Sequence, residues 1–289
     1  MINRIVEKAR SRFRDIMSGD DESIDLAEAA LLIGVEEYAS LDVNSYIKRL
    51  DFIANTARDR VQDAGDEDQM ISALNLTLFD ELGFRGNRES YYDPRNSYLN
   101  QVIDRRLGIP ITLTVIYMEV ARRIGLPVYG VGLPTHFIAM HKGAAREVYI
   151  DPFNRGRVMG RTEVEDLLAE MSGGAIELEE KHLLPVTSKQ IITRMLSNLL
   201  NIHLGNYGGG GSRYTDYARA LKVMELVLMV NPDSSAHVRD YGLLLAANGK
   251  MKQALLELDR YLALAPKATD GETIRNQINS IRAEQAKLN

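Results

Sequence analysis

The chain has 289 residues, of which 45% are hydrophobic and 26% are charged, and its formal net charge is −5. This mixture is typical of a soluble globular protein with enough apolar material for a full core. The mildly acidic charge gives no electrostatic reason to expect binding to nucleic acid or to membranes. The chain contains no cysteine, which excludes disulfides, thiolate metal sites and a cysteine nucleophile.

Neither a signal peptide nor a membrane-spanning segment is expected. The first residues, MINRIVEKARSRF, carry charges where a signal peptide would have an apolar stretch. The longest apolar runs are too short to cross a bilayer. We therefore expect a cytoplasmic protein, or a protein of an organelle stroma if the N-terminus has been processed.

Roughly the first 90 residues have the apolar spacing of helices. Helices are predicted over residues 23–39, with Asp25 or Ser23 as the N-cap, over 43–61 and over 69–84. A loop rich in Gly, Asn, Asp and Pro follows. It leads into another helix, for which Asn96 is the expected N-cap.

The next segment, ITLTVIYMEVARRIG at residues 111–125, is apolar on most of its faces and has only three charged residues. This pattern predicts a buried central helix. Pro110 suits the first turn of such a helix, and Gly125 suits its end.

After this helix the apolar period changes to two, which predicts strands over residues 126–133, 136–141 and 146–153. The sequence KGAA joins the last two strands as a short hairpin connection. If His141 faces Arg146 across that turn, His136 lies directly opposite Asp151. The sequence therefore predicts that these two side chains meet on one face of the sheet.

A repeat is visible in the last hundred residues or so, which are helical. Two similar segments end at Pro232 and Pro266, and the 34-residue spacing is that of tetratricopeptide repeats. One full repeat is predicted over about 235–268, a preceding one begins with a helix over 192–206, and a capping helix covers 272–288. The stretch YGGGGSRYT is interpreted as a flexible surface insertion or as an engineered linker. We expect the boundary between two domains, 1–186 and 187–289, near Pro185.

The segments LFDELGFRGN, YYDPRNSYLNQVIDRRLGIPITLTVIYMEVARRIGLPVYGVGLPTHF and YIDPFNRG resemble the SirB1 family. The resemblance covers roughly residues 20–270 and is most specific from Gly83 to Gly156. It implies an α+β protein, in which a papain/transglutaminase-like domain with a small antiparallel sheet is followed by an all-α tetratricopeptide-repeat domain. A related module in some F-box proteins implies a protein-interaction context.

The same resemblance implies where a catalytic site would lie. Transglutaminase-like proteins carry a cysteine at the start of a buried helix and a histidine and an aspartate on the following strands. Carried over to this chain, His136 is the histidine, Asp151 is the aspartate, and the cysteine position falls at Pro110 or Ile111. Neither of those side chains can attack a substrate, so we expect an inactive dyad. Thr114, about one turn along from Pro110, is the candidate replacement nucleophile that His136 would activate.

Two interpretations of the dyad remain open. In one, His136 and Asp151 are a satisfied polar pair that pins the sheet to the helix. In the other, His136 is the base and Asp151 the orienting group of a hydrolase or acyl-transferase. The helical repeats likewise either bind a protein or peptide partner in a groove or pack onto the first domain. We expect a non-catalytic protein-interaction or regulatory protein, with the enzyme as the alternative.

Other polar residues give weaker signals. Asp93 and Arg95 lie in the loop before the central helix and are candidates to line a cleft. The remaining histidines do not have the spacing of metal ligands, and we expect them to be surface or packing residues: His141, His182, His203 and His237. The sequence therefore predicts neither a metal nor a cofactor.

Overall fold

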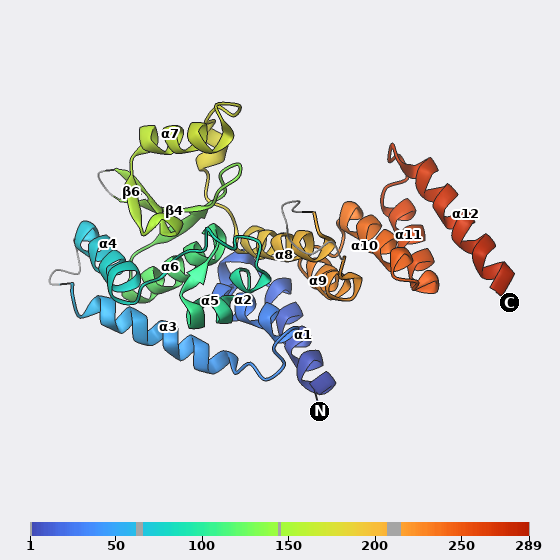
Figure 1. Ribbon diagram of the computed structural model, residues 1–289, viewed down its shortest axis with the longest axis horizontal. Coiled ribbons are helices and arrows are strands. Elements are labelled where there is room, and N and C mark those ends of the chain that lie inside the picture. Colours follow the sequence, from blue (N-terminus) through green and yellow to red (C-terminus); the bar gives the residue numbers. More distant parts are fainter. Residues whose placement is uncertain (1, 62–65, 144–145, 207–214, 289) are drawn as a thin grey trace. The chain divides into compact units, whose positions relative to one another are not determined.

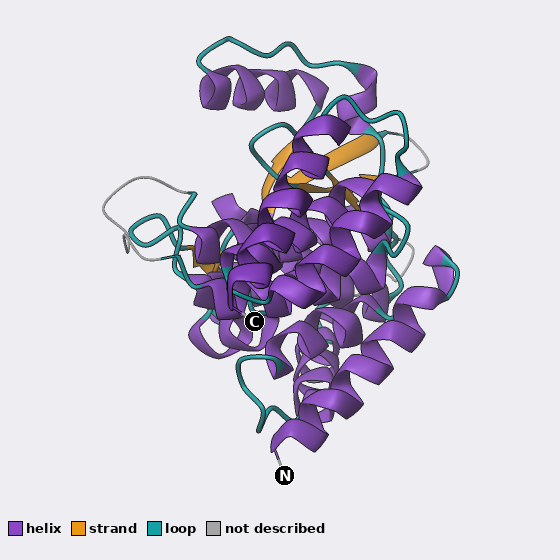
Figure 2. Cartoon of the chain, turned by 90° about the vertical axis from the view of Figure 1, so that its right-hand side faces the viewer, coloured by secondary structure: helices purple, strands orange, loops and turns teal. Residues whose placement is uncertain are grey.

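The structure is a computed structural model that describes residues 2–61, 66–143, 146–206 and 215–288. Helices make up most of the chain, and strands make up a small part of it (Figure 2). The chain divides into two compact units, Met1–Met195 and Leu196–Asn289. Within the described ranges, we find no helix that is long and apolar enough to span a bilayer.

The first unit begins with four helices, and aspartates cap the starts of the second, third and fourth. These helices are α1 (Ile2–Ser18), α2 (Leu26–Val35), α3 (Val43–Arg58) and α4 (Glu67–Asn75), and a π-helical segment (Leu76–Glu81) continues α4. The side chains of Asp25, Asp42 and Asp66 each accept a hydrogen bond from the backbone N–H three residues on. Each cap satisfies a donor that the helix itself leaves free. The three predicted helices are confirmed, and Asp25 rather than Ser23 is the cap.

A short helix and two very short strands lead to the central helix. The helix α5 (Leu99–Arg105) lies between β1 (Arg85–Gly86) and β2 (Leu107–Gly108) in the sequence, and the two strands pair in parallel. These strands were not predicted, because two residues are too few to show a period.

The central helix α6 (Pro110–Ile124) is buried along almost its whole length. Pro110 occupies its first turn, where no intrahelical N–H bond is needed. Gly125 ends it with a φ of 88°, a left-handed conformation that glycine adopts without strain. The predicted buried helix is therefore confirmed.

An antiparallel sheet follows α6. Its strands are β3 (Val128–Val131), β4 (Ile138–Lys142), β5 (Glu147–Asp151) and β6 (Arg157–Met159), and they lie in this order across the sheet. The first three strands were predicted, whereas β6 and the helix α7 (Arg161–Ser172) that follows it were not.

The sheet separates two helical layers, with α6 on one side and α7 on the other (Figure 1). On the α7 side, Met140 and Tyr149 of the sheet form one apolar cluster with Val164 and Leu167 of α7. Helices thus pack on both faces of the small sheet, although α7 covers only part of its face, and this packing fixes the segments that carry the two candidate polar residues.

The helix α8 (Ser188–Leu204) begins just after the domain boundary expected at residue 186, and the division between the two compact units falls inside it. Its first turn is capped from far away in the sequence. The Asp21 carboxylate accepts hydrogen bonds from the backbone N–H groups of Ser188 at 2.8 Å and Lys189 at 2.9 Å. The start of α8 is therefore attached to the N-terminal part of the first unit.

The second unit contains α9 (Tyr217–Val230), α10 (Ser235–Ala247), α11 (Met251–Leu264) and α12 (Gly271–Leu288). The helices α9 and α11 have equal lengths, and their first residues are 34 positions apart, as are their last. A Cβ atom on Gly242 of α10 would lie 2.8 Å from the Leu258 side chain of α11, so these two helices approach closely. The predicted repeat is confirmed. The predicted glycine-rich insertion lies outside the described residues.

Candidate functional site

His136 and Asp151 are in direct contact inside the first unit. His136 lies two residues before β4, and Asp151 is the last residue of β5. The imidazole Nε2 donates a hydrogen bond to Asp151 Oδ2 at 2.9 Å, and the two side chains are 2% and 0% exposed. The two residues that the hairpin pattern singled out are therefore adjacent and almost completely buried.

The strand register differs from the predicted one. The observed pairs are Ala139 with Ile150 and Lys142 with Glu147, so the two strands are shifted by two residues from the alignment that sets His136 opposite Asp151. Because side chains alternate between the faces, a shift of two leaves every side chain on its original face. His136 consequently reaches Asp151 from the loop before β4 and not from the strand itself.

The Asp151 carboxylate accepts four hydrogen bonds. Oδ1 receives the backbone N–H groups of Phe153 at 3.0 Å and Asn154 at 3.3 Å, and Oδ2 receives the Asn154 side chain at 2.6 Å in addition to His136. Burial alone would raise the pKa of Asp151, but the hydrogen bonds and charge of His136 and the bonds from Asn154 outweigh it. The pKa is therefore lowered below its usual value, and the carboxylate is held in its charged form.

The other side of the imidazole has no hydrogen-bond partner. His136 Nδ1 is buried, and no donor or acceptor among the described residues bonds to it. Thr114 is buried on α6, but its hydroxyl donates to the backbone carbonyl of Phe137 at 3.3 Å. Pro110 and Ile111, also buried, form the first turn of α6. The histidine thus has an orienting carboxylate, and no described hydroxyl lies within hydrogen-bond distance of its free nitrogen.

Aromatic and cationic side chains cover the pair. The Phe153 ring meets the His136 ring edge-on, with the centroids 6.0 Å apart. The Arg88 guanidinium lies 5.1 Å from the Phe153 centroid and also donates to the Asn154 side chain. Gly86 permits this arrangement, because a Cβ there would lie 2.5 Å from the Phe153 ring. Arg88 and Asn154 therefore belong to the surroundings of the pair, although the sequence analysis did not identify them.

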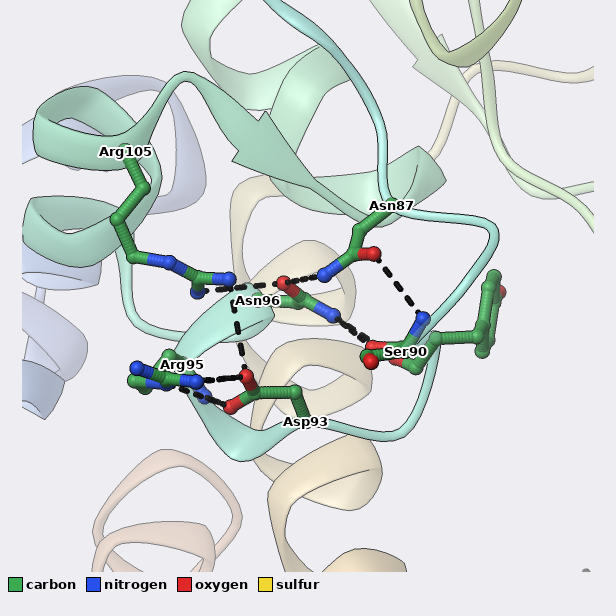
Figure 3. A network of polar contacts seen from close by, with 7 residues as sticks. Asn87, Ser90, Asp93, Arg95, Asn96 and Arg105 are labelled. Carbon is green, nitrogen blue, oxygen red and sulfur yellow. Dashed lines mark hydrogen bonds and ion pairs between the residues drawn. The ribbon is translucent and has the colours of Figure 1, made fainter.

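The loop before α5 is held together by its own side chains (Figure 3). Asn96 donates to the backbone carbonyls of Ser90 and Tyr91, and its Oδ1 accepts from Asn87 at 3.0 Å. Asn87 in turn accepts from the Ser90 backbone N–H at 3.1 Å. The prediction that Asn96 is an N-cap is wrong, because Tyr98 occupies that position and Asn96 organises the loop instead.

Ion pairs complete this loop (Figure 3). Asp93 binds the Arg95 side chain at 2.6 Å, and Arg105 approaches the same carboxylate at 3.6 Å. Burial acts to raise the pKa of Asp93, but the hydrogen bonds and charge of Arg95 prevail and lower it. Asp93 and Arg95 were candidates to line a cleft, and in the structure they bind each other.

Arg194 of α8 holds the loop that carries His136. Its guanidinium donates to the backbone carbonyl of His136 at 2.8 Å and to that of Leu133 at 3.3 Å, and it lies 5.2 Å from the Phe137 ring centroid. Within this loop Thr135 has a φ of 68°, which is unusual for a β-branched residue. Sequence spacing gives no signal for such a contact, because 58 residues separate the partners.

The remaining histidines have individual roles. His141 bonds the Pro127 carbonyl at 2.8 Å and faces Glu67 at 3.1 Å, and His182 accepts from the Glu179 backbone N–H. His203 is buried in the second unit. In the described part of the chain, no three histidine, aspartate or glutamate residues are grouped so that they could hold a metal ion.

Comparisons with known proteins agree with this architecture. Residues 44–197 match the model of the Transglutaminase-like superfamily, and residues 212–279 match that of the Tetratricopeptide repeat. The chain is 34% identical to a UPF0162 protein of Xylella fastidiosa (strain Temecula1 / ATCC 700964), over 94% of this chain and 95% of that protein. It is 26% identical to Protein SirB1 of Salmonella typhimurium, over 83% and 86% of the two chains. It is also 35% identical to F-box only protein 21 of Mus musculus, over 47% of this chain and 22% of that protein.

A buried helix against a small antiparallel sheet with a His–Asp pair, followed by repeated helices, defines a transglutaminase-like protein with tetratricopeptide repeats. The chain belongs to the transglutaminase-like superfamily and, within it, to the family of the UPF0162 proteins and Protein SirB1. The family and the α+β fold class predicted from the sequence are thereby confirmed.

Proposed function

We propose that the chain is a non-catalytic protein-interaction or regulatory protein of the cytoplasm. The transglutaminase-like domain, with an inactive His136–Asp151 dyad, serves as a scaffold. The tetratricopeptide helices bind a protein or peptide partner, as such repeats generally do.

One observation carries this proposal. The chain contains no cysteine, and the resemblance to the superfamily implies that the cysteine position falls at the start of α6, where this chain has Pro110 and Ile111. Neither side chain has an atom that can act as a nucleophile. A buried carboxylate that accepts four hydrogen bonds is, by contrast, well suited to hold a loop and a strand end together.

A second candidate function is a hydrolase or acyl-transferase that uses His136 as base, Asp151 as orienting group and Thr114 as nucleophile. The buried, unpartnered Nδ1 of His136 favours it, because such a nitrogen is free to accept a proton. The bond from Thr114 to the Phe137 carbonyl weighs against it, since the hydroxyl would have to leave that acceptor first.

Co-purification with the tagged full chain tests the proposal. The test compares the natural chain, His136→Gln and Leu256→Asp. Leu256 of α11 is the most exposed large apolar side chain described in the second unit, at 71%. We expect His136→Gln to retain the partner at a temperature where it remains folded, and Leu256→Asp to weaken the capture. The absence of any reproducible partner, or an amidase or transamidase activity that His136→Gln abolishes, would contradict the proposal.

A further inference from the structure

A cavity of about 360 Å³ opens on the α7 side of the sheet in the first unit. It involves neither His136 nor Asp151. Its floor is a row of three side chains across neighbouring strands, because Tyr129 pairs with Met140, and Met140 pairs with Tyr149. The volume lies in the range of pockets that take a small ligand or a single side chain.

The cavity is the part of this sheet face that α7 does not cover. The α7 residues Val164 and Leu167 pack against Met140 and Tyr149 from one side. The opposite wall comes from the segment before α8, with Leu183, Leu184 and Pro185. Tyr129 and Leu184 at the mouth are 45% and 62% exposed, so an apolar group that entered would bury surface that water now contacts.

Three charged groups surround this apolar floor. Lys142 and Glu147 form the next row of the sheet, and Glu180 extends from the opposite wall. Glu147 accepts a hydrogen bond from the Tyr149 hydroxyl at 3.1 Å, and burial followed by this bond raises the pKa of Tyr149 to about 12. Among the residues that line the cavity, two carboxylates outnumber one ammonium group, and the Arg161 guanidinium that pairs with Glu180 lies outside this lining.

The ion pairs that hold these carboxylates are easily replaced. Lys142 lies 3.5 Å from Glu147, and their side chains are 70% and 46% exposed. Arg161 lies 2.6 Å from Glu180, which is 81% exposed. Exposed pairs of this kind contribute little stability, so a cation from outside can take over a carboxylate at little cost.

We propose that this cavity binds an arginine side chain, flanked by apolar residues, from a peptide segment of a partner protein. The aliphatic stem packs on the apolar floor, while the guanidinium lies on the Tyr129 ring and bonds Glu147 or Glu180. Arginine fits better than lysine, because its planar fork binds a carboxylate with two bonds while it stacks on an aromatic ring. This inference rests on the proposal that the chain binds a protein partner, and it adds a second contact outside the tetratricopeptide helices.

Three model peptides test the inference on the full chain. The first is acetyl-Leu-Arg-Leu-amide. In the second, citrulline replaces arginine and removes the charge at nearly constant shape, and in the third, glutamate replaces it. The reporter is the 13C-labelled methyl group of Met140, one of 11 methionines, which is assigned with Met140→Leu. Met17, buried in α1, is the reference signal.

We expect the arginine peptide to shift the Met140 signal in a saturable way and to leave Met17 unchanged. The citrulline peptide should bind about threefold to tenfold more weakly, as loss of a cation–π contact and an ion pair implies. Glu147→Gln and Glu180→Gln should each weaken arginine binding about twofold to fivefold. Lys142→Gln should strengthen it, because it removes the competing cation.

Glu177→Gln is the matched control. Glu177 is exposed on the same segment as Glu180 but does not line the cavity, so its substitution changes the net charge equally. The inference is overturned if the arginine peptide leaves the Met140 signal in place, or if the citrulline or glutamate peptide binds as tightly. Equal weakening by Glu177→Gln would also overturn it. Partner capture by the natural chain alongside a failed peptide titration would reject this cavity and leave the proposed function standing.

Discussion

The substitution Asp151→Asn tests whether the buried pair stabilises the first unit. Asparagine keeps the size of aspartate and keeps one oxygen for the backbone N–H groups of Phe153 and Asn154. Its amide nitrogen, however, takes the place of Oδ2, which accepts hydrogen bonds from His136 at 2.9 Å and from the Asn154 side chain at 2.6 Å. The N–H groups of the His136 ring and of the Asn154 side chain would then face the new amide group, which is also a donor, in a buried space.

The expected loss follows from these contacts. A hydrogen bond to a charged group contributes about 1.5–3 kcal/mol, and leaving a buried polar group without a partner costs about 1–3 kcal/mol. The imidazole can recover part of this by moving its proton to Nδ1, so that Nε2 accepts a bond from the new amide. We therefore expect Asp151→Asn to lower the free energy of unfolding of the first unit by about 2–4 kcal/mol.

Hydrogen–deuterium exchange of the β4 and β5 amides measures this loss. It reports the opening of the sheet itself, which matters because a chain with two compact units need not unfold in one step. Asp166→Asn on the exposed side of α7 is the same chemical change in the same unit, and it should stay within about 0.5 kcal/mol of the natural chain. If Asp151→Asn behaves like this control, the pair does not hold the sheet.

The difference in stability between the natural chain and Asp151→Asn should depend on pH in a predictable way. The pKa of Asp151 is lower in the folded chain than its unfolded value of about 3.9. A group of this kind adds stability above the unfolded pKa and loses it as the pH falls through the folded pKa. The stability gap between the natural chain and Asp151→Asn should therefore be full above about pH 5 and should narrow below about pH 4. A gap that widens on acidification would contradict this assignment.

Two further substitutions test contacts around the site. Asp21→Ala should destabilise the first unit by about 1–2 kcal/mol, because the backbone N–H groups of Ser188 and Lys189 lose their cap. Amide exchange in the first turn of α8 should become faster. Unchanged exchange would show that the cap is dispensable. Gly86→Ala should cost about 1–3 kcal/mol, because the new methyl group would lie 2.5 Å from the Phe153 ring and force it aside. Hydrogen–deuterium exchange in the first unit checks both values, and a Gly86→Ala variant as stable as the natural chain would show that Phe153 moves freely.

The buried central helix and the helical repeat could be predicted, because local sequence patterns determine both. The apolar residues around α6, with Pro110 before and Gly125 after, are sufficient to predict a buried helix. The 34-residue spacing of the repeat is likewise a local signal, because each repeat packs mainly on its neighbours. The contact of His136 with Asp151 was predicted from the hairpin, although His136 makes it from the loop before β4 and not from a strand position.

The register was wrong because the sequence KGAA does not determine where the turn begins. The predicted loop covers four residues, 142–145, whereas the observed pairing of Lys142 with Glu147 leaves the four residues 143–146. A turn of the same length, moved by one residue, shifts the pairing by two. In addition, β6 is too short for its period to be recognised, although Val164, Leu167 and Leu168 have helical spacing that indicates α7.

The surroundings of the dyad depend on contacts that no local pattern contains. Arg88 reaches Asn154 across 66 residues, and Arg194 reaches the His136 carbonyl across 58. Only Asn154 had a local signal, since an aspartate that begins a turn often accepts hydrogen bonds from the residues that follow it. Such long-range contacts follow from the tertiary fold, so the packing of Phe153 and Arg88 around the His136 ring could be identified only in the structure.

The most direct test of the proposed loss of catalysis is a search for a covalent adduct. The full chain and His136→Gln are incubated with a fluorophosphonate and, separately, with p-nitrophenyl acetate, and peptides that contain Thr114 are analysed by mass spectrometry. Because the chain has no cysteine, acylation of a thiol cannot obscure the result. We expect no adduct on Thr114 in either chain. A stoichiometric adduct on Thr114 in the natural chain that is absent from His136→Gln would contradict the account and establish a working catalytic site.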